Sequence, residues 1–253
     1  MYFKIKLVIF MNFFSKIKVK FQNLLPFNEM NPIKNFDFDE ENIGESEYKD
    51  NIVLFQKEVE NHSELKEILW IGIYHCLNTF KFENECLTVL NNNFELIVDL
   101  LPGDDRRVSV PNFVKKEYKK GNILATFHNH FEGAIIPSIN DFNNSILPKL
   151  KFTVITSKNL IGIIINDNYE LNPKIFQHLI NDFKLFEVYL NFCFSNDEFD
   201  KIKLLENSFE GEEFKRQREF LFDNYVAQNI ERFVVEFNSR MEKFNVYFLY
   251  IKL

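Results

Sequence analysis

Glycine is scarce in this chain of 253 residues, which contains only 7 glycines, each far from the next. The loops that cradle phosphates in nucleotide-binding proteins need several glycines within a few positions. The sequence therefore excludes the dinucleotide-binding G-x-G-x-x-G loop and the P-loop. A function that depends on either of these two nucleotide-binding loops is therefore not expected.

Cysteine and basic charge are also limited. The 3 cysteines, Cys76, Cys86 and Cys193, show neither the C-x-x-C spacing of a zinc site nor the pairing of a disulfide scaffold. We expect them to be small, buried and reduced, as in a cytoplasmic protein. The net charge of −7 and a sequence pI of about 5.4 argue against nucleic acid as a partner.

The first 50 residues do not show the periodicity of a folded domain. Residues 1–28 contain lysine and no acidic residue, whereas residues 29–50 are acidic and weakly apolar. We interpret them as a basic arm followed by a linker. The apolar run Leu7–Phe14 is shorter than the roughly 20 residues of a membrane span, so we expect no membrane segment. Met11 is an alternative start to Met1.

Strand-like and helix-like patterns interleave between residues 51 and 168. They predict one α+β domain, in which a mixed sheet is flanked by helices. The expected elements are a strand within Asn51–Val59, a helix over Ser63–Asn78, strands over Glu85–Leu90 and Phe94–Leu101, a helix over Pro111–Lys120, a strand over Asn122–His130, a helix over Asn140–Leu147, and a hairpin of Phe152–Thr156 and Ile161–Ile165.

Residues 169–253 follow a different pattern, which predicts a helical C-terminal extension. Apolar residues recur at helical spacing in residues 174–194 and again from Glu212 to Phe244, where one long helix is expected. The apolar stripe favours packing within the chain, and a homo-oligomer through these helices is the alternative. Val246–Leu253 fits either a strand or a buried tail.

Two of the 5 histidines, His128 and His130, lie two positions apart in an expected strand, so both side chains project from the same face. Asp141 falls in the first turn of the next helix. Two imidazoles and one carboxylate suit Zn²⁺ and leave a fourth position for water, as catalytic zinc sites do. Two other interpretations stay open: Ser138-x-x-Asp141 is also the pattern of a helix-capping box, and His128 alone fits a core histidine. The other histidines, His62, His75 and His178, show no such grouping.

The spacing H-x-H-x7-S-x2-D, from His128 to Asp141, resembles the signature of the JAMM metalloproteases, also called the MPN or JAB domain family. In that family a helix precedes a strand with a glutamate, some forty residues before the first histidine. Glu85 holds this position here, and Glu83 is the alternative on the same strand face. Asn129, between the histidines, is similar to the RadC-type branch of the superfamily.

The resemblance covers about residues 51–168 and implies a sheet layered as in cytidine deaminases. It implies Zn²⁺ bound by His128, His130 and Asp141. Glu85 would be the general base, and Ser138 would stabilise the oxyanion. The expected reaction is hydrolysis of a peptide or isopeptide bond in a protein or peptide substrate, including that of a ubiquitin-like modifier. The alternatives are a metal-binding module of MPN or RadC type without protease activity, and an assembly scaffold.

Overall fold

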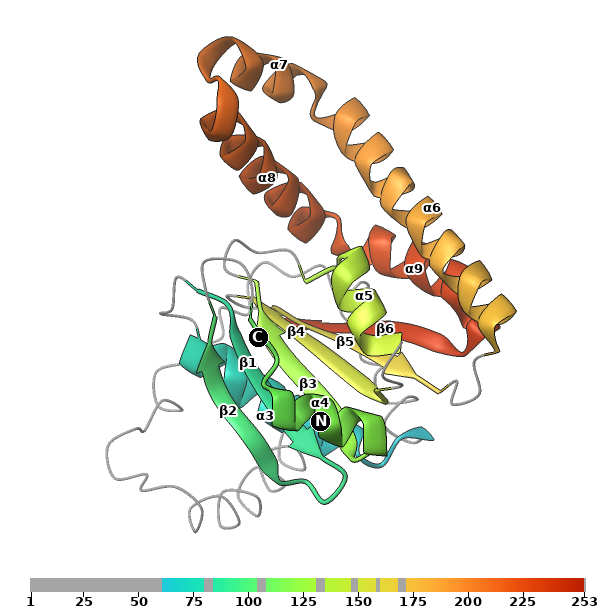
Figure 1. Cartoon of the computed structure of the whole chain (residues 1–253). Helices are drawn as coiled ribbons and strands as arrows, with labels where there is room; N and C mark the ends of the chain where they lie inside the picture. Colours follow the sequence, from blue (N-terminus) through green and yellow to red (C-terminus); the bar gives the residue numbers. More distant parts are fainter. Residues whose placement is uncertain are drawn as a thin grey trace, which may run out of the picture. The chain divides into compact units, whose positions relative to one another are not determined.

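A mixed sheet of six strands, covered by helices on both faces, forms the centre of the structure (Figure 1). The structure is a computed structural model that describes residues 61–79, 84–103, 108–130, 135–146, 150–157, 160–167 and 172–252. All of them belong to one structural unit. The predictions for the basic arm, the acidic linker, the strand within Asn51–Val59 and Glu83 lie outside the described residues.

The described helices and strands follow one another in the order predicted for an α+β protein. They are α3 (Leu65–Thr79), β1 (Cys86–Asn91), β2 (Leu96–Pro102), α4 (Asn112–Lys120), β3 (Ile123–Asn129), α5 (Ile139–Ile146), β4 (Phe152–Ser157), β5 (Leu160–Asn166), α6 (Pro173–Asp197), α7 (Phe199–Ser208), α8 (Gly211–Gln228), α9 (Ile230–Met241), a 3-10 turn η2 (Glu242–Phe244) and β6 (Val246–Lys252).

The strands are ordered β2-β1-β3-β4-β5-β6 across the sheet. Only β3 and β4 run parallel, and every other neighbouring pair is antiparallel. Strand β3, which was expected to contain the two histidines, therefore lies inside the sheet between β1 and β4. Every residue of β4 and β5 is buried, which explains why their sequences are continuous β-branched runs without alternation.

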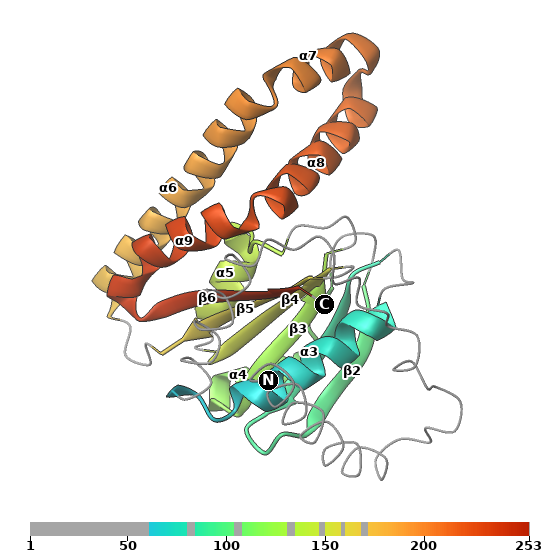
Figure 2. The ribbon, with the colours of Figure 1, turned by 180° about the vertical axis from the view of Figure 1, so that it is seen from behind.

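Alternate residues of the central strands contact different helices. Along β5, Ile161, Ile163 and Ile165 join the cluster beneath α3, whereas Ile164 joins the cluster beneath α5, α6 and α9. Figure 2 shows α3 on the near face of the sheet, and Figure 1 shows α4 and α5 on the opposite face. The metal ligands predicted from the sequence lie on the α5 side.

The predicted α+β class is confirmed, but the C-terminal helices differ from the prediction. The prediction of one long helix over Glu212–Phe244 is wrong, because α8 and α9 are separate helices that meet at Asn229. The backbone of Asn229 leaves the helical region, with φ −114° and ψ 22°. Its side-chain amide donates to the carbonyl oxygen of Tyr225 at 2.9 Å, which satisfies that oxygen where the helix ends. Helix α7, absent from the sequence prediction, precedes α8.

The C-terminal segment was predicted to be either a strand or a buried tail, and in the structure it is a strand. Strand β6 pairs with β5 over its whole length, from Asn166 opposite Val246 to Leu160 opposite Lys252. Helices α6 to α9 thus form the connection between two neighbouring strands, β5 and β6 (Figure 1). None of the described helices has the length and hydropathy that a membrane crossing requires.

Candidate metal centre

His128, His130 and Asp141 come together at one end of the sheet. His128 lies in β3, His130 follows it directly, and Asp141 is in the first turn of α5. One nitrogen of each imidazole and one oxygen of the carboxylate all lie within 4.8 Å of one another. The three side chains are 13%, 21% and 16% exposed, so the group is half-buried and open to solvent. These residues could hold a metal ion.

The distances within this group are compatible with a metal site. His128 Nε2 is 3.2 Å from one oxygen of Asp141, and His130 Nε2 is 3.5 Å from the other. Zinc ligands at about 2.0–2.2 Å in tetrahedral geometry are separated from each other by roughly 3.3–3.5 Å. Charge-assisted hydrogen bonds between such groups are shorter, at about 2.7–2.9 Å.

His128 Nε2 gives a second indication of the same kind. It is inaccessible to solvent and makes no hydrogen bond of acceptable geometry with any described residue. Its charged neighbour is the Asp141 carboxylate at 3.2 Å, and a buried imidazole nitrogen in that position is available to bind a cation. The donor set of these three residues therefore fits a metal ion.

Asp141 also takes part in a helix-capping box, as the Ser138-x-x-Asp141 pattern allowed. Its Oδ2 accepts hydrogen bonds from the backbone N–H of Ser138 at 2.9 Å and from the Ser138 hydroxyl at 2.7 Å. In return, the Asp141 N–H donates to Ser138 Oγ at 3.3 Å. The capping box and the metal group coexist, because Asp141 Oδ1 remains directed at His128.

The surroundings keep the Asp141 carboxyl ionised. Burial alone would raise its pKa, but the nearby imidazoles of His128 and His130 outweigh burial and hold the pKa well below its usual value. An ionised carboxylate is the form that binds a metal ion.

The pairing of β1 with β3 relates Glu85 to the two histidines. Strands β1 and β3 pair with Leu87 opposite His128 and Thr88 opposite Phe127. Continued by two residues, this register puts Glu85 opposite His130, and directly opposed residues of antiparallel strands project from one face. Glu85 itself is half-buried, and its carbonyl oxygen accepts a hydrogen bond from Gly103 N–H at 2.7 Å.

Comparison with known proteins assigns no family or function to this chain. Neither protein-family models, nor curated proteins, nor solved structures match this chain. The interpretation of the site thus rests on its own residues, and the JAMM resemblance stays a prediction. Among the described residues, the structure brings together the three predicted ligands and Ser138, whereas the role of Glu85 stays a prediction.

Three further residues support this site, and the sequence did not single them out for such a role. Asn129 hydrogen-bonds the backbone on both sides of Glu85. Glu187 of α6 accepts a hydrogen bond from Ile139 N–H, at the start of α5, at 2.9 Å. His75 of α3 lies beneath the sheet with its Nδ1 3.0 Å from Thr156 Oγ1. These partners are far apart in sequence, so no local pattern could have identified them.

The buried His75 makes stability depend on pH. Burial, and then the neighbouring His128, lower the pKa of its imidazole to about 3. A histidine in the unfolded chain has a pKa near 6.5. Below that pH the unfolded chain binds a proton at His75 and the folded chain does not, so the free energy of unfolding decreases. Between about pH 7 and about pH 5, this residue should remove about 2 kcal/mol of stability. Urea unfolding of the metal-free protein at both pH values measures the change.

The matched variants are His75→Asn, which keeps a polar group for Thr156, and His178→Asn on the exposed side of α6. The first should lose most of this pH dependence, and the second should keep it. An unchanged pH dependence in the His75→Asn protein would contradict the assignment.

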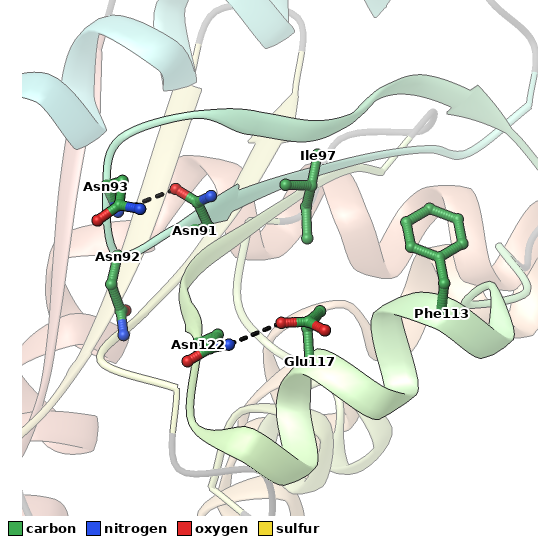
Figure 3. Close-up of a pocket in the computed structure, with 7 residues that line it drawn as sticks. All are labelled: Asn91, Asn92, Asn93, Ile97, Phe113, Glu117 and Asn122. Atoms are coloured by element: carbon green, nitrogen blue, oxygen red, sulfur yellow. Dashed lines mark hydrogen bonds between the residues drawn. The ribbon is translucent and has the colours of Figure 1, made fainter.

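The structure also has a surface pocket of about 430 Å³, which lies at the opposite end of β1 from Cys86 (Figure 3). Its polar groups already bond to one another. Asn91 Oδ1 accepts from the N–H groups of Asn93 and Glu95, and Glu117 accepts from the Asn122 amide at 2.7 Å. These contacts hold the turn after β1 and the end of α4 in place, so we assign the pocket no ligand.

Proposed function

We propose that this chain is a zinc-dependent hydrolase of JAMM type that cleaves an amide or isopeptide bond in a protein or peptide substrate. The observation that carries the proposal is the convergence of His128, His130 and Asp141, whose ligand atoms all lie within 4.8 Å of one another. Glu85, which falls on the same face when the β1–β3 register is extended, would be the base that such a hydrolase needs. The motif spacing of the sequence supports the same reaction class.

In this proposal the two imidazoles and the Asp141 carboxylate would hold the ion. When bound, zinc supplies a Lewis acid for the scissile carbonyl and lowers the pKa of coordinated water to about 7. The Glu85 carboxylate takes a proton from the attacking water and passes it to the nitrogen of the leaving amine.

Ser138 has a double assignment in the proposed reaction. Its hydroxyl donates to Asp141 Oδ2, which orients the carboxylate toward the histidines. Stabilisation of the oxyanion, the role implied by the JAMM resemblance, requires the same hydroxyl to rotate toward the substrate. Because the side chain is exposed, this rotation has room.

Metal analysis of the purified full chain tests the proposal. We expect about one zinc ion per chain in the natural protein and less than about a tenth of that in a His128→Ala/His130→Ala variant, since the loss of two of three ligands removes the site. The matched control is His178→Ala, whose side chain lies exposed on α6.

Activity is then measured on zinc-loaded protein with ubiquitin fused through its C-terminal glycine to a fluorescent peptide, and with fluorescent casein, each with and without chelator. Chelator-sensitive cleavage supports the hydrolase. Bound zinc without cleavage of any amide supports the alternative, a metal-binding module of MPN or RadC type. Natural protein that neither contains nor takes up metal would contradict both.

A further inference from the structure

Asn129 separates the two histidines, yet its side chain belongs to a different contact network. Alternate residues of a strand project from opposite faces, so Asn129 lies on the α3 side while His128 and His130 share the other. Its side chain is buried, with the residue 4% exposed. It is therefore shielded from substrate and is no candidate for a metal ligand in this site.

The amide of Asn129 bonds to the backbone on both sides of Glu85. Its Oδ1 accepts from Cys86 N–H at 2.6 Å, and its Nδ2 donates to the carbonyl oxygen of Asn84 at 3.2 Å. One bond needs an acceptor and the other a donor, so the network fixes the orientation of the amide. A serine or aspartate at this position has no equivalent pair of groups.

These bonds occur where the regular pairing of β1 and β3 ends. Strand β1 begins at Cys86 and β3 ends at Asn129, so Glu85 is the first residue beyond the ladder. On the β2 side, Gly103 N–H donates to the Glu85 carbonyl oxygen at 2.7 Å. Asn129 supplies the corresponding restraint on the β3 side. Together they fix the backbone of Glu85 from both directions.

We propose that Asn129 is a positioning residue, which holds the backbone around Glu85 so that the carboxylate faces the metal group. The inference rests on the proposed function, because Glu85 is the general base there. A base that is fixed in hydrogen-bonding reach of its proton accelerates transfer, and small displacements are costly in rate. Asn129 acts through Glu85 and contributes no contact with substrate.

A double-mutant cycle on the zinc-loaded full chain tests this, with the ubiquitin–peptide fusion as substrate. Asn129→Ala should lower kcat by roughly 10- to 100-fold, with KM within about twofold and unchanged zinc content. In a Glu85→Gln background the same replacement should change kcat by less than about twofold, because the base that it positions is already absent. A purely structural role would lower the rate equally in both backgrounds.

Asn238 provides the matched control. Its amide likewise accepts and donates, with Phe248 N–H at 2.7 Å and the Phe248 carbonyl oxygen at 2.9 Å, but it joins α9 to β6. Asn238→Ala should reduce thermal stability and leave kcat of the folded protein unchanged. If Asn238→Ala lowers kcat as much as Asn129→Ala does, the positioning role is wrong.

Amide hydrogen exchange of the metal-free protein gives a readout that does not depend on activity. In the natural protein the Cys86 amide should be protected, and Asn129→Ala should raise its exchange rate at least about tenfold while the amides of β5 keep theirs. Unchanged protection of Cys86 would overturn the proposal. If the alanine variant is too unstable, Asn129→Ser replaces it, since the shorter serine side chain lacks the two separate polar atoms with which the amide reaches Cys86 and Asn84.

The double-mutant cycle distinguishes a failure of the proposed function from a failure of the role proposed for Asn129. Full activity of the Glu85→Gln protein would remove the general base of the proposed function. An inactive Glu85→Gln protein together with an undiminished kcat of Asn129→Ala would leave the proposed function standing and remove only the role of Asn129.

Discussion

Replacement of Glu85 by glutamine is expected to lower the hydrolytic rate by roughly 10²- to 10⁴-fold, the usual contribution of a positioned general base. Glutamine has nearly the shape of glutamate but cannot take up a proton, so zinc content and substrate binding should remain. The loss should therefore appear in kcat, with KM close to that of the natural protein. Steady-state hydrolysis of the ubiquitin–peptide fusion, with zinc content measured in parallel, gives both quantities.

Glu83→Gln is the matched control, because the sequence alone could not choose between the two glutamates. When the register of β1 and β3 is extended by two residues, Glu85 falls opposite His130. Glu83→Gln should accordingly keep most of the activity. The reverse outcome, an active Glu85→Gln protein and an inactive Glu83→Gln protein, would move the base to Glu83.

Removal of the Phe183 ring is expected to destabilise the protein by about 3–5 kcal/mol, as for other fully buried phenylalanines. Phe183 of α6 stacks on Phe142 of α5, with ring centroids 4.2 Å apart and planes 13° apart. It also packs edge-on against Phe237 of α9, with ring centroids 6.2 Å apart. Urea unfolding of the Phe183→Ala protein measures the loss.

The same replacement should weaken zinc binding roughly tenfold, the lower end of the effect of residues that orient ligands. Helix α5 has only 8 residues, too few to be stable without packing. Phe142 is the direct neighbour of Asp141, so a looser α5 means a less fixed carboxylate. Competition with a chelator measures the affinity at a temperature where the variant is folded.

Phe192→Ala is the control for both effects. Phe192 lies on the same helix but is 65% exposed, so its loss should change stability by less than about 1 kcal/mol. A Phe183→Ala protein with natural stability would contradict the packing argument. Natural zinc affinity at reduced stability would show that Asp141 is held without help from α6.

Local regularities explain what the sequence could predict. The shared face of His128 and His130 follows from strand periodicity, and the place of Asp141 follows from the start of a short helix. The central strands were recognisable because buried β-branched runs have few other structures open to them. All three depend on residues that are close together in the chain.

The remaining features depend on contacts between distant segments. Asn129 meets Asn84 and Cys86 only because β1 pairs with β3, and Glu187 reaches Ile139 only because α6 returns over α5. The break at Asn229 was missed because the apolar spacing continues through it, while the side chain bonds back to Tyr225. Sequence periodicity records which face is buried, but not where the axis of a helix changes direction.

Strands β5 and β6 are neighbours with Asn166 opposite Val246, so α6 to α9 enter and leave the sheet at adjacent points. In topological terms this segment is an insertion into a β-hairpin. Its base, through Phe183 and Phe237, belongs to the core that supports α5, whereas α7 contains no buried residue. Changes in the exposed residues of α7 are therefore expected to affect the candidate metal centre less than changes at the base of the insertion.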